Sequence, residues 1–578
     1  MECFDRNLRA RGPGSGTMRR RALAVTLVAG LLAATVSAAG KNAPGKSAKP
    51  PAGKLDLQLF IDEAAASGEN RIVIPPGRYR AAPRDGMHLV LRDFHDVTVV
   101  ADDVELICTE TTRALHIQDC RNLTIRGLTI DYDPLPFTQG KVVKVSPTRR
   151  RLEIEIMNGY PTGALGRNKL EVFDPTSRTL RNRTVYGLEI ERRGKRRYHI
   201  TKRASASPGE AREQAGDIAV LNFRHISSGF KPHAVVSRDC ENLHFEAVTL
   251  YASPTFGFLE LNCTASRYDR CRIDRRPADE DLKRRAAARV RSLNADAFHS
   301  KLAPRGPVIE NCIARFQGDD CVNINGTYHL VLNSRGPTLR VLAKRGLGIE
   351  PGDEVEVWRF DGLRLPNAQV ETIQAADPLA PREENFLKEL RVLPKVRPVL
   401  RNTHTLWLDR AVNLPPGSVI GSTEARGNGF AVRNNTFGFN RSRGILIKAS
   451  DGEVTGNTLE GCWMEAIKVA PEYQWLEAGC TTDVTIRDNT ISNCHGVPIA
   501  VYAVAGTGEF APPGAHENIS IVGNSIRNAS MPGIVVTSTR GLTRRGNSFD
   551  LVRPDGNVSF RGKDLGAPRS VILVNTTR

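Results

Sequence analysis

Short apolar runs rich in β-branched residues recur along the C-terminal third of the chain, and corners containing Gly and Asn separate them. Each run follows an Asn-Thr or Asn-Ser step, and these steps begin at Asn435, Asn457, Asn489, Asn524 and Asn547. The offsets are 22, 32, 35 and 23 residues, so the unit is 22–23 residues, lengthened twice by loops at 471–482 and 503–516. This period predicts a right-handed parallel β-helix, in which each coil buries its inward residues against neighbouring coils.

The same pattern begins much earlier in the chain. The segment 72–79 (IVIPPGRY) follows an amphipathic stretch at 57–66, which we expect to cap the open end of the coil stack. The segments 120–125 (CRNLTI) and 240–245 (CENLHF) match position by position across 120 residues. A leucine-rich repeat has a similar period, but the chain lacks the LxxLxLxxN frame of that fold. We therefore predict an all-β protein built on a β-helix.

Two stretches break the period with longer alternating segments and are predicted to be inserted, barrel-like β-domains. They cover residues 140–237 and 328–424. The β-helix is then expected to occupy three parts of the chain: N-terminal coils at 55–139, central coils at 238–327 and C-terminal coils at 425–578.

The N-terminal residues have the pattern of an export signal. From Met18, which is a plausible true start, a basic segment precedes an apolar run and the small-residue site VSA at 36–38. We expect residues 1–38 to be a cleaved signal peptide and 39–54 a flexible linker, with the protein secreted or periplasmic in a bacterium. A membrane anchor is the alternative, since the run is nearly long enough to span a bilayer. No later run has that length, so no stable membrane insertion is expected.

Charge and composition narrow the classes of function. The formal net charge is +18, but the first 38 residues carry six Arg and two acids and the next 16 carry four Lys and no acid. Some +8 of the surplus therefore precedes the predicted folded body, and no nucleic-acid motif accompanies the rest, so we expect no nucleic-acid partner. An apolar content of 40% with 25% charged residues is typical of a globular protein.

The chain has eleven Cys but no CxxC pair and no zinc-type spacing. Cys462 and Cys494 share one repeat position. Buried free thiols are therefore expected, with no metal and no cofactor.

The densest group of acids lies between the two predicted insertions. Asp296 stands in the segment NADAFH (294–299), and Asp319 and Asp320 stand in GDDCVNING (318–326). The offset from Asp296 to Asp319 is 23 residues, or one coil, which would place the acids on adjacent strands about 4.8 Å apart. Crowded carboxylates raise at least one pKa and create the acid and base that glycosidic hydrolysis requires. Turn residues or a calcium site are the alternatives.

Three segments carry a family resemblance: NADAFHS at 294–300, GDDCVNINGTY at 318–328 and DYDPLPFTQG at 131–140. Together they resemble glycoside hydrolase family 110, bacterial exo-α-1,3-galactosidases that remove terminal galactose, including that of the blood-group B determinant. The resemblance runs from about residue 55 to the C terminus. It implies an inverting mechanism with Asp296 as general acid and with Asp319 and Asp320 positioning and deprotonating water. It also implies an oligosaccharide or glycoconjugate substrate, branched or linear.

Two other functions remain open from the sequence. Polygalacturonases also place NTD and DD motifs one coil apart, but the GHG turn expected soon after DD is absent, and Arg443-Gly-Ile-Leu-Ile-Lys448 only loosely resembles their RIK signature. A non-catalytic carbohydrate-binding β-helix is the third possibility. Residues that could contact sugar, but are equally expected as surface, ladder or packing residues, are His299, Asn323, Asn325, Lys448, Glu465 and Trp475.

Overall fold

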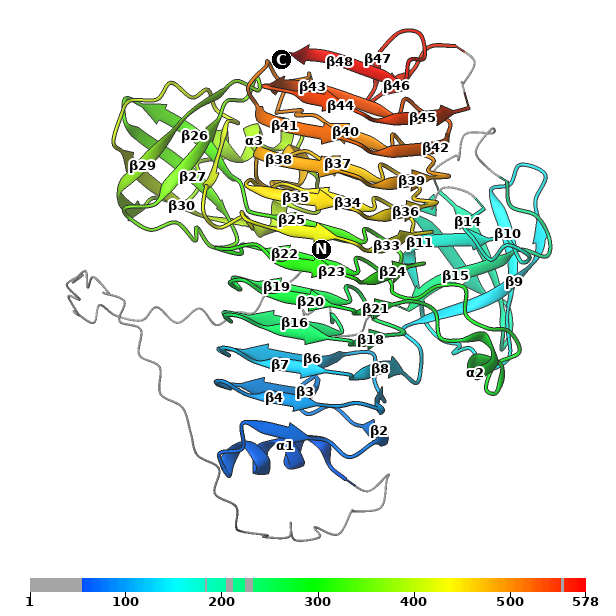
Figure 1. The fold of residues 1–578 in the computed structure, drawn as a ribbon. Helices are drawn as coiled ribbons and strands as arrows, with labels where there is room; N and C mark the ends of the chain where they lie inside the picture. The colour runs from blue at the N-terminus through cyan, green and yellow to red at the C-terminus, as the bar shows by residue number, and fades with distance from the viewer. Residues whose placement is uncertain (1–54, 182–184, 204–211, 224–231, 553–555, 578) are drawn as a thin grey trace, which may run out of the picture.

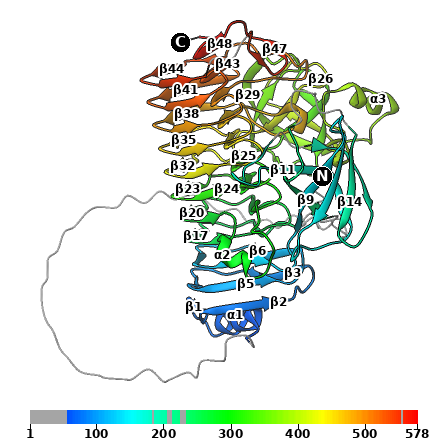
Figure 2. The ribbon, with the colours of Figure 1, turned by 90° about the vertical axis from the view of Figure 1, so that its right-hand side faces the viewer.

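The computed structural model describes residues 55–577 except 182–184, 204–211, 224–231 and 553–555. The predicted signal peptide and linker lie outside these residues. The chain winds into a stack of coils that rises from the helix α1 (Leu57–Ala66) to the C terminus, and two β-rich insertions project from it (Figure 1). After a quarter turn, both insertions are seen on the same side of the stack (Figure 2). The predicted fold class, a parallel β-helix with two inserted small β-domains, is confirmed.

Each coil contributes strands to three parallel ladders, which run along the stack. The first ladder contains β1 (Arg71–Val73), β4 (Thr98–Val100), β7 (Thr124–Arg126), β17 (His244–Glu246), β20 (Arg267–Asp269), β23 (Val308–Glu310), β32 (Ala431–Arg433), β35 (Gly452–Thr455), β38 (Thr482–Arg487), β41 (His516–Val522) and β44 (Thr543–Arg545). The second contains β2 (Gly77–Ala81), β5 (Val104–Cys108), β8 (Thr129–Tyr132), β18 (Thr249–Leu250), β21 (Arg272–Ile273), β24 (Ile313–Arg315), β33 (Thr436–Gly438), β36 (Thr458–Glu460), β39 (Thr490–Ser492), β42 (Ser525–Ala529) and β45 (Ser548–Leu551).

The third ladder carries the candidate site on its outward face. It contains β3 (Met87–Arg92), β6 (Arg113–Gln118), β16 (Val235–Arg238), β19 (Phe258–Leu261), β22 (Phe298–Lys301), β25 (Val322–Asn325), β34 (Ile445–Ile447), β37 (Ile467–Val469), β40 (Ile499–Val501), β43 (Ile534–Arg540) and β48 (Val571–Thr576). Inward residues of these strands, such as Phe298, Val322 and Ile445, stack one above another in the apolar core.

The repeated asparagines form a ladder of their own inside the coil corners. The Nδ2 of Asn435 donates to the Oδ1 of Asn457 at 2.8 Å, and the same bond links Asn457 to Asn489 at 2.9 Å, Asn489 to Asn524 at 2.9 Å and Asn524 to Asn547 at 2.9 Å. Each amide also bonds a backbone group, so the tight corners bury few unsatisfied polar atoms. The ten described cysteines are buried free thiols, as predicted.

The helix α1 covers the open end of the stack. Its buried residues Leu57, Ile61 and Ala64 belong to the same apolar core as the first coils. The side chain of Gln58 donates to the carbonyl of Val90 at 2.9 Å and accepts from the amide of Val90 at 2.7 Å. These two bonds satisfy backbone groups at the exposed sheet edge, which would otherwise be open to pairing with another chain. None of the helices described between residues 55 and 577 is long and apolar enough to cross a membrane.

The first insertion is a seven-stranded antiparallel sheet with the order β12-β11-β15-β9-β10-β14-β13. It begins at Phe137, three residues before the predicted boundary. Its strands are β9 (Phe137–Val145), β10 (Arg151–Ile156), β11 (Leu165–Phe173), β12 (Val185–Tyr186), β13 (Leu188–Arg192), β14 (Arg197–Lys202) and β15 (Ile218–Phe223). The short helix α2 (Ala278–Leu282) follows β21 of the central coils.

The second insertion is a closed barrel with the strand order β26-β27-β30-β29-β28-β31. Its elements are β26 (His329–Arg335), β27 (Thr338–Lys344), β28 (Glu354–Trp358), β29 (Arg364–Ala375), α3 (Pro381–Glu389), the 3-10 helix η1 (Arg397–Val399), β30 (Leu400–Leu408) and β31 (Val419–Ser422). Two further short elements lie in the C-terminal coils: the 3-10 helix η2 (Tyr473–Trp475) and the hairpin β46 (Ser559–Phe560)–β47 (Lys563–Asp564).

Candidate active site

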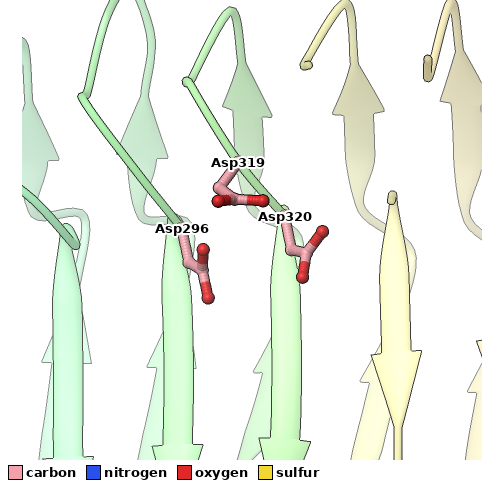
Figure 3. Close-up of side chains that lie close together, drawn as sticks. All are labelled: Asp296, Asp319 and Asp320. Atoms are coloured by element: carbon pink, nitrogen blue, oxygen red, sulfur yellow. The ribbon is translucent and has the colours of Figure 1, made fainter. Parts of the chain in front are cut away.

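Three aspartates meet at the N-terminal ends of two neighbouring strands, β22 and β25 (Figure 3). One carboxylate oxygen from each of Asp296, Asp319 and Asp320 can be chosen so that all lie within 4.8 Å of one another. Because Phe298 pairs with Val322, the residue opposite Asp296 in the ladder is Asp320, and the local coil is 24 residues. The offset of 23 that paired Asp296 with Asp319 was wrong by one residue. Asp319 instead stands in the turn beside that pair.

The environment of Asp319 favours a negative charge. Its side chain is 32% exposed and forms an ion pair with Arg441. Burial acts to raise the pKa of this carboxyl, but the positive charges of Arg441, Arg443 and Lys169 together lower the pKa below its ordinary value. Asp319 is therefore ionised at neutral pH.

The other two carboxyls are held closer to neutrality. Asp320 is 3% exposed, and its burial, reinforced by the charges of Asp319 and Asp296, raises its pKa to about 7 even though Arg443 opposes the shift. Burial also raises the pKa of Asp296, which is 4% exposed, while a hydrogen bond from His299 opposes that shift. The site thus holds an ionised carboxylate beside two carboxyls that retain protons more readily, which is the combination that acid–base catalysis needs.

An outward row of side chains runs along the ladder through the site. Strand register places Asp296, Asp320, Arg443 and Glu465 at successive equivalent positions. The backbone amide of Arg443 donates to Asp320 Oδ1 at 2.9 Å, and its guanidinium lies 3.5 Å from the same oxygen and 2.9 Å from Glu472 Oε1. Arg443 therefore fixes Asp320 on the side away from Asp296.

A second outward row forms a polar floor beside the aspartates. His299 and Asn323 are register partners, and Asn325 lies two residues further along β25. His299 Nδ1 lies 2.8 Å from Asp296 Oδ2, and its Nε2 lies 3.2 Å from Asn325 Nδ2, which also donates to Asn323 Oδ1 at 3.1 Å. With Asn325 donating to Nε2, the Nδ1–H of His299 is the group that donates to Asp296. The structure therefore brings His299, Asn323 and Asn325 to the trio, as buried and mutually bonded side chains.

The remaining predicted contact residues have other partners. Lys448 is buried next to the floor, where its Nζ bonds Glu477 at 2.7 Å and Asn323 at 3.2 Å. Glu465 forms an ion pair with Arg561 of the C-terminal hairpin. Trp475 is not brought to the trio: its ring packs against the second insertion, with Lys395 Nζ 3.8 Å from the ring centroid. The structure therefore gives no support to the expectation that Trp475 could contact a sugar at this site.

The segment 131–140 supports the site without joining it. Asp131 forms buried ion pairs with Arg289 at 2.9 Å and Arg276 at 3.0 Å. Gln139 accepts from the amide of Val290 at 2.9 Å, and the carbonyl of Pro136 accepts from Asn294 Nδ2 at 3.1 Å. These bonds hold the chain that leads into Asp296. They give a physical reason why the segment 131–140 accompanies the aspartate trio.

Several residues near the trio were missed from the sequence. Arg443 was detectable, since aligning Gly444-Ile445 with Cys321-Val322 places it one register step after Asp320. Arg441, Lys169 and Tyr186 carried no repeat signal, because the last two lie on β11 and β12 of the first insertion, where they are cross-strand partners. The Tyr186 hydroxyl accepts from Arg441 at 2.6 Å, which places the insertion at the edge of the site.

A cation site is the rival interpretation of the trio, since clustered carboxylates bind hard cations. Here the guanidinium groups of Arg441 and Arg443 already contact Asp319 and Asp320. These positive charges do the neutralising that a cation would otherwise provide. The arrangement favours acid–base chemistry.

Comparisons with known proteins agree with the fold and identify relatives. A family model described as a right handed beta helix region matches residues 418–558. The chain is 23% identical to alpha-1,3-galactosidase B of Bacteroides thetaiotaomicron, over 90% of this chain and 87% of that protein. It is 22% identical to alpha-1,3-galactosidase B of Akkermansia muciniphila, over 84% and 62%. It is 30% identical to alpha-1,3-galactosidase A of Streptomyces avermitilis, over 40% and 36%.

Some solved structures can be superposed on most of the chain, but with low TM-scores and low sequence identity. The A-module of a mannuronan C-5 epimerase from Azotobacter vinelandii has a TM-score of 0.37 at 12% identity, covering 89% of this chain and 91% of that one. A family 28 exopolygalacturonase from Yersinia enterocolitica has a TM-score of 0.38 at 11% identity, covering 89% and 74%. The sequence relatives confirm the predicted resemblance and the assignment of the chain to the glycoside hydrolases.

Proposed function

We propose that this glycoside hydrolase, similar in sequence to bacterial α-1,3-galactosidases, removes terminal α-1,3-linked galactose from oligosaccharides or glycoconjugates. The observation that carries the proposal is the trio itself. An ionised Asp319 lies beside Asp296 and Asp320, whose burial raises both of their pKa values, on adjacent coils of a β-helix. Blood-group B glycans are the proposed natural substrates, and the N-terminal signal makes export part of the same proposal.

Each carboxyl then has a distinct role. Asp296 is the general acid that protonates the leaving glycosidic oxygen, because burial raises its pKa against the opposing hydrogen bond from His299 and so favours the protonated carboxyl. Asp319, ionised and the most exposed of the three, removes the proton from water, and Asp320 positions that water. Arg441 holds the carboxylate of Asp319 in place, and Arg443 holds that of Asp320.

Inversion of the anomeric centre belongs to the proposal through the family resemblance. The oxygen separations within 4.8 Å are shorter than the 6.5–9.5 Å usual for inverting enzymes, so distance does not supply the argument. Proton NMR of the first-formed sugar decides the point. β-Galactose is expected from an α-galactoside, and α-galactose as the first product would overturn inversion.

The charges beside the trio favour a neutral sugar over a galacturonate. Arg443 and Lys468 both pair with Glu472, and Lys448 pairs with Glu477 at 2.7 Å. These buried cations are therefore already neutralised by the protein, and a uronate carboxylate would have to compete with Glu472 and Glu477 for them. This arrangement supports a neutral sugar, and not a uronate, as the proposed substrate.

The C-terminal hairpin supports action on chain ends. Its Arg561 reaches the outward row at Glu465, the position that follows Arg443. Phe560 packs edge-on against Tyr502, with ring centroids 5.2 Å apart. The hairpin therefore covers the row one coil beyond the site, which suits a terminal sugar better than the middle of a polysaccharide.

A substrate screen with matched variants tests the function. Wild type should release galactose from fucosylated B trisaccharide or from linear galactosyl-α-1,3-galactose, and not from polygalacturonate. Asp296→Asn should fold normally and lose about 10²–10⁴-fold in kcat on these substrates, but less on a nitrophenyl α-galactoside, whose leaving group needs little protonation. Activity confined to polygalacturonate, or unchanged hydrolysis by Asp296→Asn, would reject the proposal.

A further inference from the structure

We propose that Lys169 of the first insertion is a positioning residue. It holds together the two turns that lead into Asp296 and Asp319. The first insertion is then part of the catalytic unit and not an appended domain. This inference rests on the proposed function, because it takes the aspartate trio as the catalytic group.

The ammonium of Lys169 bridges the two turns through their backbones. Its Nζ donates to the carbonyl of Asn294 at 2.8 Å and to the carbonyl of Gly318 at 2.9 Å, and lies 3.1 Å from Glu171 Oε1. Asn294 precedes Asp296 by two residues, and Gly318 immediately precedes Asp319. An ammonium has three donors, of which two are used in these hydrogen bonds, and the ion pair with Glu171 adds a third contact that restricts the orientation of the side chain.

The surrounding contacts hold the lysine in that orientation. Glu171 Oε2 accepts from Arg291 at 2.7 Å, and Arg291 in turn donates to Asn294 Oδ1 at 2.8 Å and to Asn222 Oδ1 of β15. Lys169 and Glu171 are 7% and 1% exposed. Two strands of the insertion, β11 and β15, therefore hold the turn that carries Asp296 through a largely buried network of ion pairs and hydrogen bonds.

The close approach of Lys169 explains why position 318 is a glycine. A Cβ added to Gly318 would lie 2.5 Å from Lys169 Nζ and 2.7 Å from the carbonyl of Asn294. Any side chain at this position would therefore displace the ammonium or separate the turns. The glycine of the GDD segment is required by the approach of a residue 149 positions away in the chain.

Lys169 also acts on the charge of the trio. Its ammonium is one of the three cations that lower the pKa of Asp319, after Arg441 and Arg443. Burial lowers the pKa of Lys169 itself to about 8; Glu171 and Asp319 oppose this shift, whereas Arg291 and Arg441 add to it. Loss of the lysine should therefore disturb both the geometry of the turns and the titration of Asp319.

A matched pair of variants separates positioning from stability. Lys202 is a second buried lysine of the same insertion, 1% exposed and ion-paired with Glu213. Lys169→Met and Lys202→Met each leave a buried glutamate without its lysine, so both should lower the thermal unfolding midpoint. Only Lys169→Met should reduce kcat, by about 100-fold, with KM changed less than about threefold.

The pH dependence of kcat/KM separates the two roles, because loss of a lysine that only stabilises the fold would leave it unchanged. In Lys169→Met the acidic limb of kcat/KM should move to higher pH, because the pKa of Asp319 rises when the ammonium is removed. In Lys202→Met the limb should stay in place and kcat should remain within about twofold of wild type. Unchanged kcat and pH profile in Lys169→Met, or equal losses in both variants, would overturn the inference.

Two further measurements keep the test decisive. Gly318→Ala retains the lysine but displaces it, and should lower kcat; normal activity of this variant would contradict the inference even if Lys169→Met did not fold. Hydrogen exchange of peptides covering 291–297 and 317–321 should accelerate in Lys169→Met and not in Lys202→Met. This second readout needs no activity, so it distinguishes failure of the positioning role from failure of the proposed galactosidase function.

Discussion

At the scale of single residues, the protonation of the site is decided by what surrounds each aspartate. Asp319 has Arg441, Arg443 and Lys169 nearby, and their charges outweigh its burial. Asp320 has fewer compensating charges and is more deeply buried, so its pKa rises to about 7. Three residues of one type therefore have pKa values shifted in different directions because their neighbours differ.

The pH dependence of activity follows from this difference. Groups with raised pKa values are protonated below those values and lose the proton as the pH rises. Asp320 should therefore lose its proton as the pH rises through about 7, and the raised pKa of Asp296 acts in the same direction, so kcat/KM should fall by up to tenfold per pH unit on the alkaline side. The measurement is kcat/KM on an α-1,3-galactoside from pH 4 to 9. Circular dichroism over the same range serves as the control for folding, and activity that keeps rising to pH 9 would contradict this assignment.

At the scale of elements, the repeat period acts through ladders of like residues. Each interior asparagine of the corner ladder (Asn457, Asn489 and Asn524) accepts from the asparagine of one coil and donates to that of the next, so the bonds run continuously along the C-terminal coils. Asn489 lies in the middle, is fully buried and also donates to the carbonyl of Val454 at 2.9 Å. Asn547 is at the end of the ladder and is half-buried. The cost of losing an amide should therefore depend on its place in the ladder.

Replacement of single ladder amides tests this dependence. Asn489→Ala should lower the free energy of unfolding by roughly 2–3 kcal/mol, because it leaves buried partners on both neighbouring coils without their bonds. Asn547→Ala should cost less than about 1 kcal/mol, since Asn547 is half-buried at the end of the ladder and water can take the place of its amide. Urea unfolding followed by circular dichroism measures both. Equal losses of unfolding free energy in the two variants would show that the effect does not depend on the position of the amide in the ladder.

Register is the element-scale property that the sequence predicted incompletely. The period placed the NAD and GDD segments on adjacent coils, and the structure agrees. The pairing within that coil is 24 residues, so Asp320 and not Asp319 stands opposite Asp296. The period alone cannot fix the pairing to within one residue, because coils of 22 to 24 residues all fit the repeat. Only the hydrogen-bonded pairing of the strands distinguishes them.

At the scale of the whole molecule, the basic surplus is separate from the chemistry. The aspartate trio is acidic, while exposed arginines of the first insertion form surface pairs, such as Arg203 with Glu189 at 3.1 Å and Arg193 with Glu191 at 2.8 Å. Surface pairs of this kind contribute little to stability. The net charge of +18 is expected to influence where the protein resides and not which bond it cleaves.

Retention on an anionic glycan tests this role of the charge. The protein should be retained on immobilised anionic mucin at low salt and released at about 0.3 M NaCl, where the Debye length is under about 10 Å. A neutral glycan matrix of the same density is the control. Retention that is insensitive to salt would mean that specific sugar contacts, and not the charge, hold the protein.

The amino-acid sequence by itself determined the coil architecture, the asparagine ladder and the meeting of two acidic turns on neighbouring coils. These features depend on contacts between adjacent repeats, so a local period encodes them. Only the tertiary structure decided that Asp320 faces Asp296, that Asp319 is the ionised member, and that Lys169 bridges the turns. Docking of the first insertion joins residues more than 100 positions apart with no period between them, and each pKa sums burial and charge from several such segments.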